Sequence, residues 1–169
     1  MDKQKKFGRL YDEHVDEIYR FVFLKVSTRE LAQDITSETF KKGWQSFKEN
    51  PGMENPRAYL YRIARNLVID HYRTKKQHIT DQEIIDELED HSKDLQEKAA
   101  EAKEMAKIKE AMENLKDDYQ DIIIYKYLDE LSNSEIADIM GKSEGAVRVT
   151  AHRAIAALEK EIEKRKKED

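Results

Sequence analysis

A short stretch near the C-terminus, residues 143–153, carries polar and basic side chains of the types that read DNA. Arg148 can donate hydrogen bonds to guanine or to a phosphate, and the side chains of Ala146 and Val149 can contact the methyl group of a thymine. Glu144 can accept a hydrogen bond from a cytosine amino group, or it can simply complement the positive end of a helix dipole. The residues predicted to face duplex DNA are Ser143, Glu144, Arg148, Val149, His152 and Arg153.

Two helices joined by a tight turn are predicted to position these side chains. Ser132 or Ser134 can cap a helix that begins near Glu135. Gly141 can end this helix because glycine tolerates the left-handed conformation of a tight turn, and Ser143 can cap the next helix. The expected apolar faces are Ile136, Ile139 and Met140 on the first helix and Val147, Ala151, Ala154, Ile155 and Leu158 on the second. The spacing is typical of a helix-turn-helix, and an ordinary helical hairpin with a solvated basic face is the alternative.

A second concentration of basic side chains lies at residues 55–76, where six Lys and Arg accompany one acid, Asp70. Pro56 favours a helix start. Basic residues interleaved with aromatic rings suit single-stranded DNA, because cations follow the phosphates while rings stack on unpaired bases, and Tyr61 and Tyr72 are expected at the edge of the exposed face. In the alternative, the tyrosines belong to the core and Asp70 pairs with Arg73 one turn on. The expected buried face is Leu60, Ile63, Ala64, Leu67 and His71.

The composition predicts an all-α protein. Of its 169 residues 40% are charged, Gly (5) and Pro (2) are scarce, and no stretch alternates cleanly between apolar and polar residues. The absence of cysteine excludes disulfides and thiolate metal sites, and no signal peptide or long apolar run is evident, so a soluble cytoplasmic protein is expected. The five His are scattered and there is no Gly-rich phosphate loop, so no metal, cofactor, catalytic residue or small-molecule substrate is predicted.

Charge is unevenly distributed along the chain. Residues 1–79 carry 16 Lys and Arg against 11 Asp and Glu, residues 80–118 carry 6 against 14, and residues 119–169 carry 9 against 11. The first 76 residues hold 11 of the 14 aromatic residues and can bury a core. Two small helical domains, residues 1–78 and 108–169, are therefore predicted, joined by an acidic linker at 79–107 that acts as a spacer or keeps the chain off DNA until a partner displaces it. The expected core of the second domain includes Ile122, Ile123, Tyr127 and Leu128.

Nearly the whole chain resembles an extracytoplasmic-function (ECF) sigma factor of the bacterial sigma-70 family. Four motifs in order carry the resemblance. YDEHVDEIYRFVFLKV is similar to the first core helix, RELAQDITSETFKKGWQSF to the polymerase-binding segment, AYLYRIARNLVIDHYR to the promoter −10 segment, and GKSEGAVRVTAHRAIAAL to the −35 reader. The resemblance implies that the two domains are sigma region 2 and sigma region 4.

The resemblance also implies a function: directing RNA polymerase to promoters in a stress or envelope response, with no catalysis by this chain. Residues 30–44 would bind the β′ clamp helices of core polymerase, and the implied contacts are Asp34, Glu38, Thr39, Phe40 and Trp44. The loop between Trp44 and Tyr59 would hold a flipped base of the −10 strand, and the implied −10 contacts are Asn55, Tyr61, Arg62, Arg65, Asn66 and Arg73. The second domain would read the −35 duplex and dock near the β flap. A further implied partner is an anti-sigma factor, which can hold the chain at the membrane.

Val149, Thr150 and Ile155 depart from the family pattern, which often has basic or polar residues there, so duplex binding is expected to depend on polymerase. The main alternative is a stand-alone helix-turn-helix regulator, in which the segment from Asp34 to Trp44 is ordinary helix surface and core. A purely structural helical adaptor is disfavoured because it leaves the basic and aromatic face unexplained.

Overall fold

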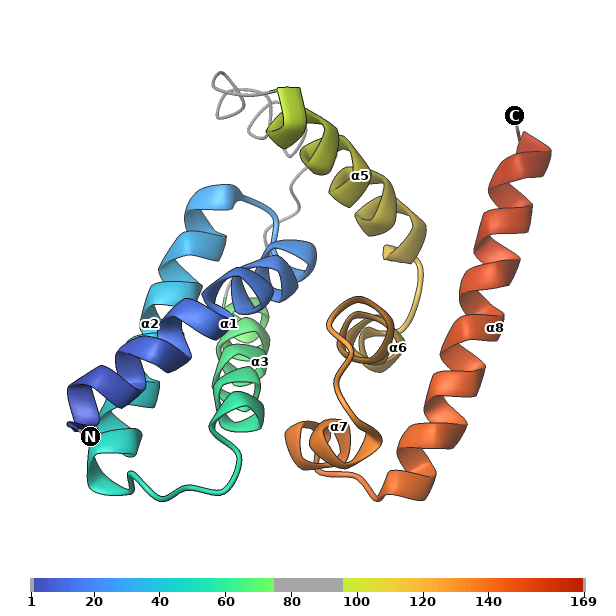
Figure 1. The fold of residues 1–169 in the computed structure, drawn as a ribbon. Coiled ribbons are helices and arrows are strands. Elements are labelled where there is room, and N and C mark those ends of the chain that lie inside the picture. Colours follow the sequence, from blue (N-terminus) through green and yellow to red (C-terminus); the bar gives the residue numbers. More distant parts are fainter. Residues whose placement is uncertain (1, 75–95, 169) are drawn as a thin grey trace. The chain divides into compact units, whose positions relative to one another are not determined.

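The computed structural model describes residues 2–74 and 96–168, and these residues fold as helices and short connections, with no strand among them (Figure 1). The predicted all-α fold class is confirmed. The chain divides into two compact units, Met1–Ala102 and Lys103–Asp169. The predicted linker lies partly outside the described residues, and its remainder is helical. The domain boundaries at 78/79 and 107/108 stay predictions, because helix α5 (Gln96–Met112) continues across the second of them.

The first unit is built from α1 (Lys3–Lys25), α2 (Arg29–Glu49) and α3 (Pro56–Thr74), and each of the three helices packs against the other two. Side-chain caps fix where α2 and α3 begin. The Thr28 hydroxyl accepts a hydrogen bond from the Leu31 N–H at 3.1 Å, and the Asn55 side-chain oxygen accepts one from the Ala58 N–H at 3.0 Å. Fully buried side chains of the core include Ile18, Phe21, Val22, Ala32, Tyr61 and Ala64.

The buried face of α3 is rotated from the predicted one. Its buried residues are Ala58, Leu60, Tyr61, Ala64 and Val68, whereas Ile63, Leu67 and His71 are only half-buried. The expected place of Tyr61 on the exposed edge is wrong: its side chain is 0% exposed, and its ring centroid lies 6.0 Å from that of Phe21. Burying a large aromatic ring contributes more to stability than burying the aliphatic side chains on the neighbouring face, so the helix turns Tyr61 inward. Tyr72 is exposed, as predicted, and its hydroxyl donates to the Lys25 carbonyl.

An ion network ties α1 to α3. Arg57 donates two hydrogen bonds to the Glu17 carboxylate, at 3.0 and 2.9 Å, and His14 Nδ1 lies 2.7 Å from the same carboxylate. Burial by itself would raise the pKa of Glu17, but the hydrogen bonds and charges of His14 and Arg57 more than offset it and hold that pKa below its usual 4.5. Ionised Glu17 therefore stabilises the unit.

Replacement of Glu17 by Gln is expected to lower the free energy of unfolding of this unit by about 1–2 kcal/mol near neutral pH. Because the pKa is lower in the folded state, the stabilisation is present above the unfolded-state pKa and is lost as the pH falls through the folded-state pKa. The difference between the two proteins, measured by urea unfolding at about pH 7 and about pH 3, is thus expected to become smaller in acid. Asp16→Asn, at an exposed position on the same helix, is the control; an equal difference at both pH values contradicts the network's role.

The second unit contains the part of α5 from Lys103 onward, α6 (Asp117–Ile123), a π-helical turn η1 (Ile124–Leu128), α7 (Asn133–Met140) and α8 (Glu144–Glu168). Ile122 and Ile123 are buried as predicted, but Tyr127 is 49% exposed and Tyr125 is buried instead. The prediction for Tyr127 is wrong because the π turn is wider than an α turn and moves Tyr127 out of register with Ile123.

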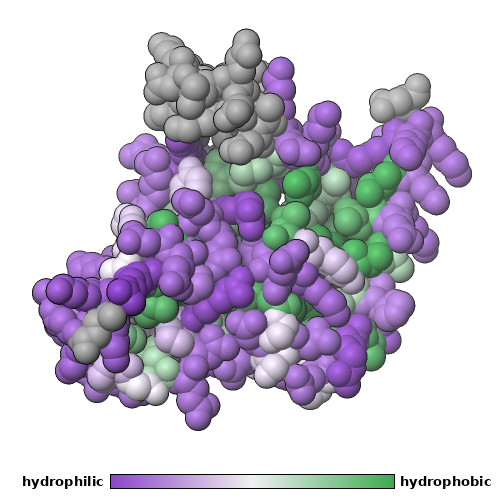
Figure 2. Space-filling model, in the orientation of Figure 1, coloured by the Kyte–Doolittle hydropathy of each residue, from purple (hydrophilic) through white to green (hydrophobic). Residues whose placement is uncertain are grey.

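Hydrophilic side chains cover most of the visible surface, with smaller apolar areas among them (Figure 2). In the described part of the chain, no helix combines the length and apolar character needed to cross a membrane.

Candidate nucleic-acid interface

Helix α7 begins and ends at the residues that a helix-turn-helix requires. The Ser132 hydroxyl accepts a hydrogen bond from the Glu135 N–H at 3.0 Å, and the Glu135 carboxylate accepts one from the Ser132 N–H at 3.1 Å. This capping box selects Ser132 over Ser134 as the cap. Gly141 ends the helix with φ 66°, in the left-handed region, as predicted.

Helix α8 presents the predicted DNA-facing residues to solvent. The Ser143 hydroxyl accepts a hydrogen bond from the Ala146 N–H at 3.1 Å and so caps the helix. Val147, Ala151 and Ala154 are buried, which orients the helix. All six predicted residues lie exposed at its start or on its opposite face: Ser143, Glu144, Arg148, Val149, His152 and Arg153. Their places on the exposed face are confirmed, and their contacts with DNA stay a prediction.

Two polar contacts that sequence reasoning missed hold the helix-turn-helix in place. Lys142, in the turn before α8, forms an ion pair with Asp118 of α6 at 3.0 Å. Lys126 of η1 donates to the side-chain oxygen of Asn133, the first residue of α7, at 3.1 Å. The Lys142–Asp118 partners lie 24 residues apart, and no spacing rule along a single helix predicts such a pair.

On α3, the predicted −10 residues do not all lie together. Arg62, Asn66 and Arg73 are exposed and Arg65 is half-buried. The prediction that Tyr61 contacts the −10 strand is wrong, because its side chain has no access to solvent. The remaining predicted −10 residue, Asn55, is half-buried and caps α3 through its side-chain oxygen, so it orders the connection that precedes the basic face.

The connection between α2 and α3 is shorter than the predicted span from Trp44 to Tyr59, because α2 continues to Glu49 and α3 begins at Pro56. The Met53 N–H donates to the Asn50 carbonyl at 3.3 Å within this connection. The hydroxyls of Ser46 and Tyr59 lie 2.9 Å apart and join the two helices where they flank it. The connection on which the predicted base contact falls is therefore residues 50–55.

On α2, the predicted polymerase contacts divide into surface and core. Asp34 is exposed, and Glu38 and Trp44 are half-buried. Thr39 and Phe40 are buried, and the Thr39 hydroxyl donates to the Ile35 carbonyl at 2.7 Å. Direct contact of Thr39 and Phe40 with a partner is therefore contradicted, because both side chains pack inside the unit.

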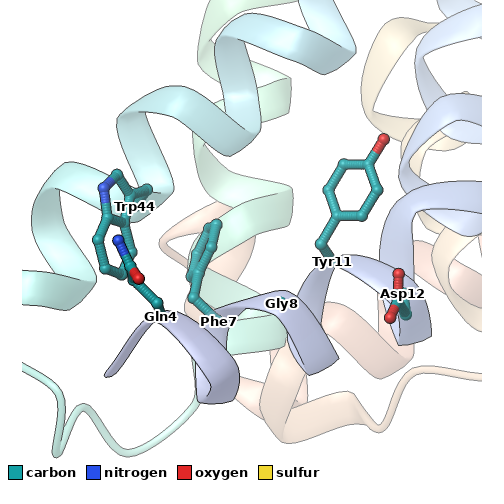
Figure 3. A pocket seen from close by; sticks show the side chains of 6 residues that line it. All are labelled: Gln4, Phe7, Gly8, Tyr11, Asp12 and Trp44. Atoms are coloured by element: carbon teal, nitrogen blue, oxygen red, sulfur yellow. The ribbon is translucent and has the colours of Figure 1, made fainter. Parts of the chain in front are cut away.

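Trp44 lines a concavity of about 350 Å³ between α1 and α2 (Figure 3). Phe7 of α1 lies between Trp44 and Tyr11 in this view, and its ring centroid is 5.4 Å from that of Trp44. The Tyr11 ring packs edge-on against Phe40, with centroids 4.9 Å apart. Phe40 is thus not itself a lining residue of the concavity, but it packs against Tyr11, which is one.

Comparison with known proteins assigns the family. The model of Sigma-70 region 2 matches residues 10–78, and the model of Sigma-70, region 4 matches residues 105–158. The ECF RNA polymerase sigma factor SigW of Bacillus subtilis is 31% identical over 168 residues, an alignment that covers 94% of this chain and 90% of SigW. The chain belongs to the ECF group of the sigma-70 family. Sigma factors direct RNA polymerase in transcription initiation and are not themselves enzymes.

One further relative and one solved structure are similar to this sigma factor. The ECF RNA polymerase sigma factor BldN of Streptomyces coelicolor is 32% identical over 155 residues, which cover 90% of this chain but only 58% of BldN. The sigma factor RpoE of Bartonella quintana, solved in complex with the anti-sigma factor NepR, has the same fold, with a TM-score of 0.70. At 20% identity, the comparison covers 94% of this chain and 98% of RpoE.

The two family matches place the candidate surfaces of the sigma factor in different regions. Region 2 includes α3 and the exposed part of α2, and region 4 includes the helix-turn-helix. The last ten described residues of α8, 159–168, lie beyond the region 4 match. Within this extension, Arg165 pairs with Glu110 at 3.1 Å and with Glu113 at 3.2 Å, so it is held against the end of α5.

Proposed function

We propose that this sigma factor directs core RNA polymerase to promoters by using one unit for the melted −10 strand and the other for the −35 duplex. The observation that carries the proposal is the exposure of basic side chains on one helix in each unit. In the first unit these are Arg62 and Arg73 on α3, and in the second they are Arg148 and Arg153 on α8. A repressor that binds only duplex DNA requires only the second surface.

In the −35 complex, α8 is the recognition helix and enters the major groove with its N-terminal turns. Arg148 and Arg153 donate to guanine or phosphate, and His152 lies one turn from Arg148 on the same face. The Lys142–Asp118 ion pair fixes the turn that sets the depth of this helix. The surface is small, so polymerase supplies most of the affinity.

In the −10 complex, residues 50–55 hold a flipped base while Arg62, Asn66 and Arg73 follow the strand. Extruding a base costs a few kcal/mol. The phosphate contacts of α3, together with the attachment of both units to polymerase, offset this cost. Asn55 takes part by ordering the end of the connection through its cap of α3.

Core polymerase binds α2 through the β′ clamp helices, with Asp34, Glu38 and Trp44 as contacts, and the β flap receives the second unit. Asp34 and Glu38 are one turn apart on the helix, so their carboxylates face a basic partner together. The aromatic concavity beside Trp44 provides an apolar neighbour for the same surface.

We further propose that an anti-sigma factor regulates this chain in the cytoplasm, in a stress or envelope response. Support comes from the fold shared with RpoE of Bartonella quintana, whose complex contains the anti-sigma factor NepR. An anti-sigma factor attached to a membrane would hold the chain there, since none of its described helices can span one.

Run-off transcription with purified core polymerase on genomic fragments tests the function. Start sites that appear only when the chain is added are the expected result, and they reveal both promoter elements. A stand-alone regulator would instead bind duplex fragments without polymerase and create no start site with core polymerase, which would exclude the sigma function.

A further inference from the structure

The exposed face of α8 has an apolar midline. Val149 is 50% exposed, the most exposed of the large apolar side chains in the described part of the chain. Successive residues of an α-helix are rotated by about 100°, so Gly145, Val149 and His152 fall near one line along the helix. This line lies opposite the buried Val147, Ala151 and Ala154 and is therefore the part of α8 that projects furthest from the unit's core.

Gly145 leaves space at the start of this line. A Cβ atom at Gly145 would meet nothing closer than the Ser143 hydroxyl, at 4.0 Å, and the residue does not have a positive φ. Neither packing within the unit nor backbone conformation requires glycine there, although glycine in a helix is destabilising relative to alanine. Glycine at this position is explained if a bound molecule approaches the helix backbone closely, because a side chain there would block the approach.

The apolar character of the midline determines which chemical group of a bound molecule can contact it. Val149 has no hydrogen-bonding group, and Gly145 has no side chain, so neither can read a donor or an acceptor of a base edge. The thymine 5-methyl is the apolar group that base edges show in the major groove. Arg148 and Arg153 flank the midline, and neither makes an ion pair among the described residues, so their guanidinium groups can bind phosphate or guanine on either side.

Building on the proposed function, we propose that Val149 reads the 5-methyl group of one thymine in the −35 element, in a groove that Gly145 allows α8 to enter closely. The competing explanation for the exposure of Val149 is that it contacts a protein partner. The two differ in one respect: only the DNA contact depends on a single methyl group at a single base.

The test uses the full chain with core polymerase and templates whose −35 segment is randomised. Sequences enriched by run-off transcription define the element, and each thymine in it is then replaced by deoxyuridine, which lacks the methyl group. With the wild-type chain, one such replacement is expected to lower transcription about fourfold, the value of one buried methyl group. With Val149→Ala, the same replacement is expected to have no effect.

Two variants complete the experiment. Ile162→Ala removes a comparably exposed side chain (39% exposed) of the same helix, beyond the region 4 match, and is expected to keep the wild-type response to deoxyuridine. Gly145→Ala is expected to raise the thermal stability of the chain and yet reduce transcription from the selected element. A uniform loss with Val149→Ala on every template, with no response to deoxyuridine, overturns the proposal in favour of a protein contact. If the chain creates no start site on any template, the proposed function itself fails and the inference fails with it.

Discussion

Replacement of Gly43 by Val is expected to lower the free energy of unfolding of the first unit by about 3 kcal/mol, the upper range for overpacking a close-packed core. Gly43 is buried on α2, where a Cβ atom would lie 2.6 Å from a methyl carbon of Leu60 on α3. The same atom would lie 3.6 Å from the Phe7 ring of α1. Leu60 is itself buried and has little room to move, so the added atoms separate α2 from α3.

The measurement follows urea unfolding by the fluorescence of Trp44, which is the single tryptophan of the chain and reports on this unit alone. Gly8→Ala is the matched control, because Gly8 is an exposed position of α1 with nothing within 4 Å of an added Cβ atom. Alanine is expected to stabilise the unit there by about 0.5–1 kcal/mol. An unchanged midpoint for Gly43→Val would mean that α2 and α3 are not packed as closely as described.

The local signals in the sequence were sufficient for the helix-turn-helix. Gly141, Ser143 and the single apolar face of α8 each point to one arrangement, so the exposed positions of Arg148 and Arg153 follow from periodicity alone. On α3 both faces carry apolar or aromatic residues, and periodicity does not choose between them. The packing of Tyr61 against Phe21 decides the rotation, and that contact joins two helices 40 residues apart.

The site on α2 shows a different limit of prediction from sequence. The family motif that runs from Asp34 to Trp44 mixes residues that face solvent with residues that hold the helix in place. Thr39 and Phe40 belong to the second kind, and a linear motif does not distinguish them from Asp34. The contact of Arg57 with Glu17 could not be predicted from the sequence either, because it depends on how α1 crosses α3.

The double replacement of Asp34 and Glu38 by Lys is expected to lower transcription by about a hundredfold or more, through loss of core polymerase binding. The two carboxylates are one turn apart on α2 and neither makes an ion pair among the described residues, so their removal leaves the unit's own contacts intact. Charge reversal at a contact with a basic partner replaces attraction by repulsion at two points, and each is worth about 1.4 kcal/mol or more, which is tenfold or more in affinity.

Glu159→Lys with Glu163→Lys is the matched control, since it makes the same charge change at the same spacing on the exposed face of the α8 extension. Binding is measured by co-elution with core polymerase and folding by circular dichroism. If the Asp34 and Glu38 variant folds but no longer binds, α2 is the attachment surface, and these two carboxylates rather than the buried Thr39 and Phe40 carry the contact. If it binds core polymerase as tightly as the control, the attachment surface lies elsewhere, and the acidic pair is ordinary helix surface, as a stand-alone regulator would have it.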